Sequence, residues 1–208
     1  MSKIRFVGLD VHADTIAIAV AEPNGEVRSV GTIRNRPEDL RKAIHRLGSP
    51  DKLRTCYEAG PNGYAVYWQL AEIGVHCDVI APSLIPVKAG DRVKTDRRDA
   101  EKLARCYRAG DLTPVWVPTP EHEALRDLVR AREDAKQDQL RARHRLSKFL
   151  CRHAKRPPVT IKKNWTAKYM DWIKRQVHFQ QHALMATLPD YVHEVENAAE
   201  RITRLDSR

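Results

Sequence analysis

Apolar and polar residues alternate along the first part of the 208-residue chain. The alternating runs read IRFVGLDV, TIAIAVAE and EVRSVGTIR, between Ile4 and Arg34. A period of two is typical of half-buried β-strands, because successive side chains point to opposite faces of a sheet. Asn24 and Gly25 separate the last two runs, and an Asn-Gly pair supplies the positive φ angles of a tight hairpin turn. The pattern therefore predicts a three-stranded antiparallel meander.

Helical and strand-like segments alternate after this meander. They are a helix at 37–47, a strand at 53–58, a helix at 60–73, a strand at 75–81, a helix at 95–108 and a short edge strand at 115–117. Thr95 stands where an N-cap residue is expected. Strands separated by a helix run parallel through a crossover, so the five main strands form a mixed sheet. The predicted fold class is α/β, with a ribonuclease H-like mixed five-stranded sheet and helices.

A different pattern begins after Pro118. From residue 121 to about 153 there is no Gly or Pro, and apolar residues recur at the spacing of one long amphipathic helix. We expect two further helices, one over about 165–187 and one that begins at Pro189 and is still in progress at Arg208. Because the sequence stops inside this last helix, we expect the chain to be part of a longer protein. The predicted domains are an α/β domain at 1–118 and a helical, coiled-coil-like segment at 119–208.

The long helix also bears on assembly. At about 1.5 Å per residue it spans roughly 50 Å, and a small domain cannot cover the apolar stripe of such a helix along its whole length. Part of the stripe needs another helix, from the same chain or from a second subunit. We therefore expect a homo-oligomer, a dimer or a higher assembly.

Charge is distributed unevenly. Residues 1–119 hold 18 basic and 15 acidic side chains, a net charge of +3, whereas residues 120–208 hold 19 and 12, a net charge of +7. No acidic residue occurs from Gln139 to Met170, where basic residues recur. Such a run favours contact with nucleic-acid phosphates, although a solvated helix face is the alternative. The candidate nucleic-acid-binding residues are Arg141, Arg143, Arg145, Lys148, Arg152, Lys155, Arg156, Lys162 and Lys163.

The aromatic residues Trp165, Tyr169 and Trp172 follow this run at helical spacing. They suit either stacking on unpaired RNA bases or, more commonly, packing between helices. The cysteines form no C-x-x-C pair, and no stretch resembles a signal peptide or a membrane span. We expect Cys56 and Cys77 to be buried structural thiols, and the protein to be cytoplasmic, with no membrane partner.

Four carboxylates are candidates for a metal site. Asp10 and Glu58 close the first and fourth strands, which are parallel neighbours in a sheet of this kind. Asp96 and Asp99 lie three residues apart, on one face of the helix that starts there. Four converging carboxylates need a counter-charge, and Mg²⁺, with Mn²⁺ as a substitute, takes oxygen ligands and supports phosphoryl transfer. His12 touches this site only if the first strand continues to it.

Each acid has an alternative explanation. An Asp at a strand end or at a helix start is often a cap or a partner of the helix dipole. Glu58 is harder to explain in this way, because a buried acid at the end of an apolar strand needs a partner or a cation.

The order of GLDVHADT, YEAG and KTDRRDAEKLA closely resembles the DEDD-type transposases of insertion-sequence family 110. The resemblance implies a RuvC-like N-terminal domain in which Asp10, Glu58, Asp96 and Asp99 are the catalytic, Mg²⁺-binding acids. It also implies that a structured guide (bridge) RNA pairs with target and donor DNA, in a bacterial cell and close to the nucleoid. Members carry a further C-terminal domain with a serine nucleophile, and neither Ser147 nor Ser207 has the context of that residue.

The sequence thus predicts the N-terminal part of a DNA transposase or recombinase that binds metal, guide RNA and DNA for strand cleavage and exchange. A non-catalytic nucleic-acid-binding module with structural acids is an alternative, as is a nuclease that resembles a Holliday-junction resolvase. An ATP-using enzyme of the actin and sugar-kinase class is disfavoured, because that class has two such domains and further Gly-rich loops, whereas the nine glycines here are scattered.

Overall fold

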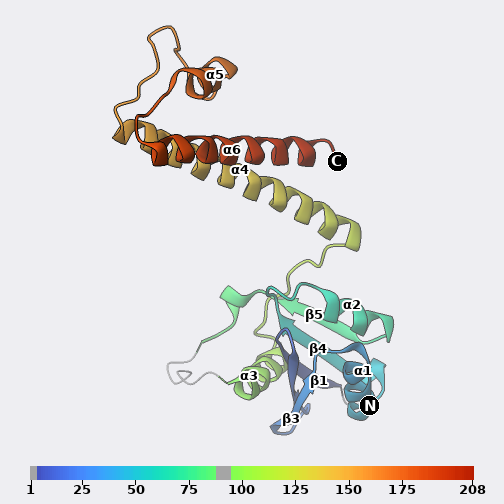
Figure 1. Ribbon diagram of the computed structural model, residues 1–208. Coiled ribbons are helices and arrows are strands. Elements are labelled where there is room, and N and C mark those ends of the chain that lie inside the picture. The colour runs from blue at the N-terminus through green and yellow to red at the C-terminus, as the bar shows by residue number, and fades with distance from the viewer. Residues whose placement is uncertain (1–3, 88–94) are drawn as a thin grey trace. The chain divides into compact units, whose positions relative to one another are not determined.

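The computed structural model describes residues 4–87 and 95–208. The chain divides into two compact units, Met1–Val117 and Pro118–Arg208 (Figure 1). Lys94, the first residue of the KTDRRDAEKLA stretch, lies outside the described residues.

The first unit is built on one five-stranded sheet. Its strands are β1 (Arg5–Val11), β2 (Thr15–Ala21), β3 (Val27–Arg34), β4 (Leu53–Glu58) and β5 (His76–Ile80). The order across the sheet is β3-β2-β1-β4-β5. Strands β1, β2 and β3 pair antiparallel, whereas β4 pairs parallel with both β1 and β5. This arrangement confirms the predicted ribonuclease H-like mixed sheet.

Two local predictions about this sheet are wrong. The β2–β3 connection lies where it was expected, but neither Asn24 nor Gly25 has a positive φ. Pro23 fixes its own φ and starts a turn that Gly25 closes by donating its N–H to the Glu22 carbonyl at 3.4 Å, so no left-handed residue is needed. The edge strand expected at 115–117 is reduced to an isolated bridge between Pro114 and β5.

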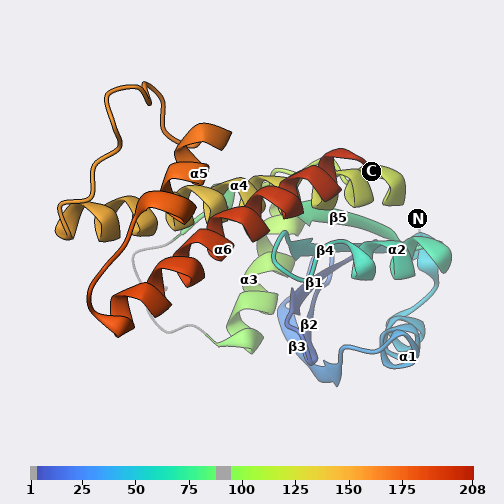
Figure 2. The ribbon, with the colours of Figure 1, turned by 45° about the horizontal axis from the view of Figure 1, so that its top comes forward.

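Helices cover both faces of the sheet (Figures 1 and 2). Helices α1 (Pro37–Leu47) and α2 (Ala65–Glu72) pack on one face, over a core that includes Leu9, Ile16 and Tyr57. Helix α3 (Asp96–Ala109) packs on the other face, where small side chains of β2 meet Ala100 and Ala104. Because side chains alternate along a strand, Asp10 and Glu58 project on the side of α3.

The second unit consists of α4 (Pro120–Arg152), α5 (Ala167–Gln176) and α6 (His182–Asp206). Helices α4 and α6 lie side by side in Figures 1 and 2, and ion pairs join the early part of each helix to the late part of the other, as an antiparallel pair requires. Their core includes Leu146, Phe149, Ile173 and Val192. Tyr169 and Trp172 are buried, which confirms that they pack between helices.

The predicted division of this region into helices is wrong after α4. A helix over 165–187 was expected, but the chain leaves the helical path at Val177 and re-enters it at His182. Pro189, expected to begin a helix, lies inside α6. An interior proline removes a hydrogen bond at a cost of about 3 kcal/mol, and the burial of neighbouring apolar residues such as Leu188 and Val192 offsets it.

The expectation for two of the cysteines is met. Cys56 and Cys77 are buried. Near the start of α4, the apolar residues Leu125 and Val129 are each 57% exposed, so the described part of this unit does not cover this end of the apolar stripe. In the portions of the chain that the structure describes, no helix combines the length and the apolar character needed to cross a bilayer.

Candidate metal centre

The strand acids lie at one end of the sheet. Asp10 is the penultimate residue of β1, and Glu58 is the last residue of β4. The parallel register pairs Leu9 with Tyr57, so the next residues, Asp10 and Glu58, are neighbours at the same edge. Glu58 is exposed, so the argument that a buried acid here needs a partner does not hold. Its position beside Asp10, not its burial, makes it a candidate.

The helix acids reach the same edge because α3 starts there. The Thr95 side chain caps the helix by accepting a hydrogen bond from the Arg98 N–H at 3.3 Å, as predicted. Asp96 and Asp99 occupy the first turn. Helix N-termini favour negative side chains, which stabilises this turn whether or not a cation is present.

Gly8 allows α3 to lie directly on β1. A Cβ atom at this position would be 2.3 Å from the Ala100 carbonyl oxygen and 2.5 Å from the Ala104 backbone nitrogen. No side chain fits in that space. The glycine of the GLD stretch thus sets the distance between the helix and the strand, and with it the distance between Asp96 and Asp10.

All four acids line one open cleft of about 1070 Å³. Two side-chain amides hold the backbone beside the cleft: Asn62 Nδ2 donates to the Val11 carbonyl at 2.9 Å, and Asn35 Nδ2 donates to the His12 carbonyl at 2.8 Å. These bonds fix the chain where it leaves β1, next to Asp10.

The surroundings of Asp10 disfavour the negative charge of its carboxylate. Burial raises the pKa of the Asp10 carboxyl, contact with His12 opposes this rise, and the negative charges of Asp99 and Asp96 add to it, so that the pKa lies above its ordinary value. A carboxylate that is partly buried beside two others is stabilised by a nearby cation. The oxygen-rich set therefore fits a hard divalent ion.

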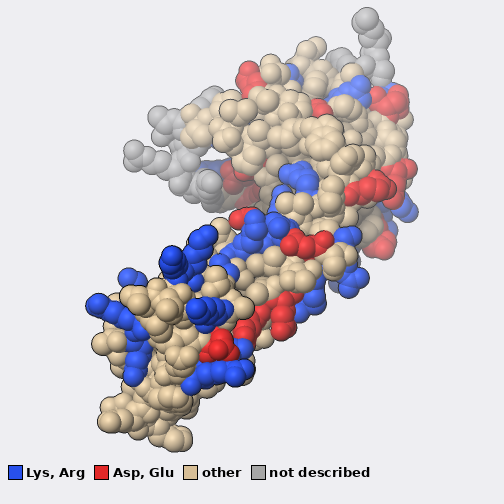
Figure 3. All heavy atoms as spheres, turned by 90° about the horizontal axis from the view of Figure 1, so that it is seen from above, with Lys and Arg blue, Asp and Glu red and all other residues tan. Residues whose placement is uncertain are grey.

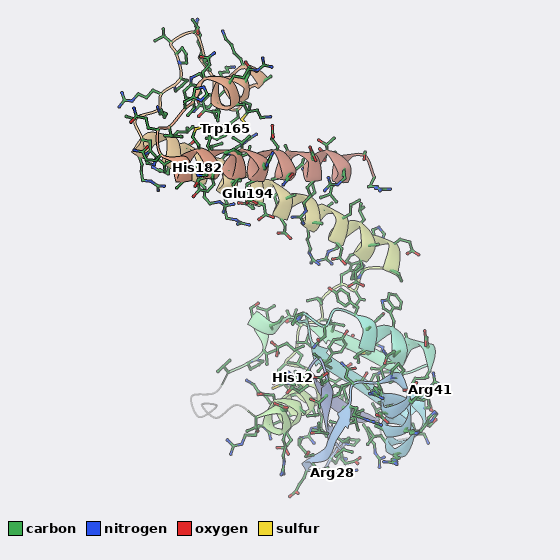
Figure 4. All side chains as sticks on the ribbon, viewed as in Figure 1. His12, Arg28, Arg41, Trp165, His182 and Glu194 are labelled. Atoms are coloured by element: carbon green, nitrogen blue, oxygen red, sulfur yellow. The ribbon has the colours of Figure 1, made fainter. Side chains whose placement is uncertain are left out.

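One histidine belongs to the closest part of this cluster. One ligand atom each from Asp10, His12 and Asp96 lies within 4.8 Å of the other two. Glu58 and Asp99 line the same cleft without joining that group. His12 follows β1 directly and lies with its side chain near α3 (Figure 4).

Helix α3 also brings basic residues that the sequence analysis missed. Arg98, Lys102 and Arg105 line the cleft together with the acids. Their spacing of four and three residues places them along one side of the helix. That spacing is visible in the stretch RRDAEKLAR.

The nine basic candidates of the helical unit do not form one uniform surface. Arg141 and Arg145 make ion pairs, Arg141 with Asp138 at 2.5 Å and Arg145 with Glu194 at 2.9 Å. The Arg143 guanidinium lies over the Trp165 ring, 5.4 Å from its centroid. The remaining six make no ion pair among the described residues: Lys148, Arg152, Lys155, Arg156, Lys162 and Lys163. In Figure 3, both basic and acidic side chains line the helical unit.

Comparison with known proteins gives the family. Residues 7–154 match the family model of IS110 DEDD transposases, which is described as a transposase. The chain belongs to the IS110 transposase family. The matched range begins in β1 and ends just after α4, so it takes in all four candidate acids.

Two relatives of this IS110 chain are similar over most of its length. A protein of Sinorhizobium fredii named as a transposase, y4qE, is 46% identical over 91% of the chain. The transposase of insertion sequence element IS1533 from Leptospira borgpetersenii is 36% identical over 100% of the chain. The chain spans 49% and 60% of the length of these two relatives.

Solved structures that resemble the IS110 chain include RuvC of Thermus thermophilus. It is 14% identical, covers 54% of the chain and 100% of its own length, and gives a TM-score of 0.38. RuvC of T. thermophilus in complex with a Holliday junction substrate is 10% identical over 54% of the chain and 99% of its own length, with a TM-score of 0.33.

Proposed function

We propose that this chain forms the metal-binding part of an insertion-sequence transposase that cleaves and exchanges DNA strands. Asp10, Glu58, Asp96 and Asp99 hold Mg²⁺, with Mn²⁺ as a substitute. The observation that carries the proposal is the convergence of acids from β1, β4 and α3 on one open cleft. Several carboxylates in an open cleft suit a cation that bridges the protein and a DNA phosphate.

In this proposal the acidic and the basic residues of the cleft have different roles. The carboxylates bind the cation, which when bound activates a nucleophile and stabilises a leaving oxygen in phosphoryl transfer. Arg98, Lys102 and Arg105 neutralise phosphates of the strand that enters the cleft, which holds the strand without reading its sequence. The capped first turn of α3 keeps Asp96 and Asp99 in place.

The helical unit supplies a second nucleic-acid surface in this proposal. Basic side chains that are not paired with acids of the same unit, such as Arg152, Arg156 and Lys163, contact the backbone of DNA or of a structured guide RNA. The exposed apolar residues Leu125 and Val129 of α4 suit contact with a second subunit, so that the working assembly is a dimer or larger.

Calorimetric titration with Mn²⁺ and with Mg²⁺, with and without a DNA duplex, tests the metal site. We expect binding by the wild-type chain and its loss, by at least about tenfold in affinity, in both Glu58→Gln and Asp99→Asn. Glu72→Gln, which changes an exposed acid on α2, is the matched control and should bind as the wild type does. If neither ion binds under either condition, the acids are structural and the chain is a non-catalytic nucleic-acid-binding module.

A further inference from the structure

The side chain of His12 bridges two of the acids from different elements. Its Nε2 atom lies 3.2 Å from Asp10 Oδ2 on β1 and 3.6 Å from Asp96 Oδ1 on α3. The His12 side chain is 53% exposed, so it is not a core residue whose position is explained by packing. We propose that His12 is a nitrogen ligand of the cleft cation and makes the site prefer a transition-metal ion such as Mn²⁺ to Mg²⁺. The proposal rests on the metal site of the proposed function.

The distances suit adjacent ligands on one ion. Two neighbouring ligand atoms on an octahedral ion with bonds of about 2.1 Å are about 3.0 Å apart. The two separations from His12 Nε2 are 3.2 Å to Asp10 and 3.6 Å to Asp96, so the first is close to this value and the second is about 0.6 Å longer. The Asp96 side chain is 57% exposed, so packing does not hold it away from His12.

The backbone holds His12 in position for this role. The His12 N–H donates to the Thr15 carbonyl at 2.8 Å, and its carbonyl accepts from Asn35 Nδ2 at 2.8 Å. Both peptide groups of the residue are therefore fixed, and only the side-chain torsions remain free. Such support is what a metal ligand requires, because a loosely held ligand loses entropy on binding.

A second histidine in the same sheet shows what distinguishes His12. His76 Nε2 lies 3.2 Å from Asp78 Oδ2, with the same spacing of two residues along a strand. Asp78, however, also accepts a hydrogen bond from the Tyr107 hydroxyl at 2.5 Å, and no second acid among the described residues forms an ion pair with His76. The His76–Asp78 pair of β5 thus has no second acid beside the histidine among the described residues, whereas the His12–Asp10 pair at the end of β1 has Asp96 of α3 beside it.

The chemistry follows from the ligand types. Mg²⁺ takes oxygen ligands and keeps its waters, whereas imidazole nitrogen suits transition-metal ions. Replacing one oxygen ligand of a carboxylate site by imidazole therefore raises the relative affinity for the transition-metal ion. The remaining acids, Glu58 and Asp99, line the same cleft and complete the set of candidate ligands.

Pulsed electron paramagnetic resonance of Mn²⁺ bound to the chain tests the proposal directly, with and without a DNA duplex. We expect a hyperfine coupling to a directly bound nitrogen in the wild type and in His76→Ala, and its loss in His12→Ala. Calorimetry on the same samples should show Mn²⁺ affinity reduced at least about tenfold in His12→Ala, with Mg²⁺ affinity changed much less.

His12→Gln separates ligation from mere positioning of Asp10. The amide of Gln can still donate to Asp10 but offers only oxygen to a cation, so we expect the Mn²⁺ preference to disappear while Mg²⁺ binding persists. Bound Mn²⁺ without nitrogen coupling in the wild type, or equal losses of Mn²⁺ and Mg²⁺ in His12→Ala, overturns the role of His12 and leaves the carboxylate site standing. Absence of Mn²⁺ binding in every sample overturns the metal site itself and this proposal with it.

Discussion

Substitution of Gly8 by Ala tests whether the close contact between β1 and α3 builds the site. The added methyl group would lie 2.3 Å from the Ala100 oxygen, 2.5 Å from the Ala104 nitrogen and 2.9 Å from Leu103 Cβ. Ordinary contacts between non-bonded atoms begin at about 3.5 Å, so the helix has to move away from the strand by about 1 Å. The two nearest atoms belong to the backbone, and no rotamer change can relieve the overlap.

The cost is estimated from core overpacking. Inserted methyl groups destabilise by about 1–3 kcal/mol, and a clash with backbone belongs at the upper end of that range. With a urea m value of about 2 kcal/mol/M, a loss of about 3 kcal/mol lowers the unfolding midpoint by about 1.5 M. The same displacement exceeds the roughly 0.5 Å tolerance of a binding site, so divalent-cation affinity should fall as well, because Asp96 and Asp99 move with α3.

Urea unfolding followed by circular dichroism, together with calorimetric titration of Mn²⁺, measures both effects. Gly60→Ala is the control, because a Cβ atom there has no neighbour closer than 3.9 Å and the φ of Gly60 is not positive. We expect that variant to unfold at the wild-type urea concentration or slightly above it. An unchanged midpoint and unchanged Mn²⁺ affinity in Gly8→Ala would refute the claim that this glycine sets the spacing of the acids.

Three further results are expected. Asp10→Asn should raise the stability of the metal-free chain near pH 7, because the pKa of Asp10 is raised in the folded state and the wild-type chain therefore loses stability as the pH rises through that pKa. The advantage of Asn should vanish below about pH 3.9, where the carboxyl is protonated in both the folded and the unfolded state. Urea titrations at several pH values measure the difference. A thiol reagent at pH 8 should label the exposed Cys151 and not the buried Cys77, whose pKa burial raises to about 12, until the chain is unfolded; mass spectrometry distinguishes the two. Lys163→Gln should reduce the slope of log affinity against log salt for duplex DNA by about 0.9, whereas Arg145→Gln, which removes a residue already paired with an acid, should change it little; equal changes would mean that the ion pair opens on binding.

The α/β unit was predictable because its signals are local and repeated. A period of two marks each strand whatever its neighbours do, and the crossovers through α1 and α2 leave only a mixed sheet. The neighbouring positions of Asp10 and Glu58 follow from that topology. The proximity of Asp96 to Asp10 depends in addition on Gly8, whose role as a contact point is not visible in a hydrophobic pattern.

The errors arise where tertiary contacts override local preference. Pro189 marks a helix start in isolation, but packing of α6 on α4 carries the helix through it. A count of basic residues along the sequence also does not show that Arg145 pairs with Glu194, a contact between α4 and α6. The contact of the nine basic candidates with nucleic acid stays a prediction. His12 was expected to touch the site only if the first strand continued to it, but β1 ends at Val11 and His12 Nε2 still lies 3.6 Å from Asp96 Oδ1. That contact joins a strand end to a helix 84 positions later, which a strand pattern does not show.

The segment that leaves the α/β unit also protects it. Val115 donates its N–H to the Val79 carbonyl, and Ala81 donates its N–H to the Thr113 carbonyl, so residues 113–115 occupy hydrogen-bonding groups along β5, which is an edge strand. Exposed edges are templates for pairing between molecules. A fragment that stops at Gly110, where α3 is capped, would therefore keep strands β1–β5 and helices α1–α3 but expose the edge of β5 to pairing with another molecule. A fragment that continues through Val117 would keep this edge covered.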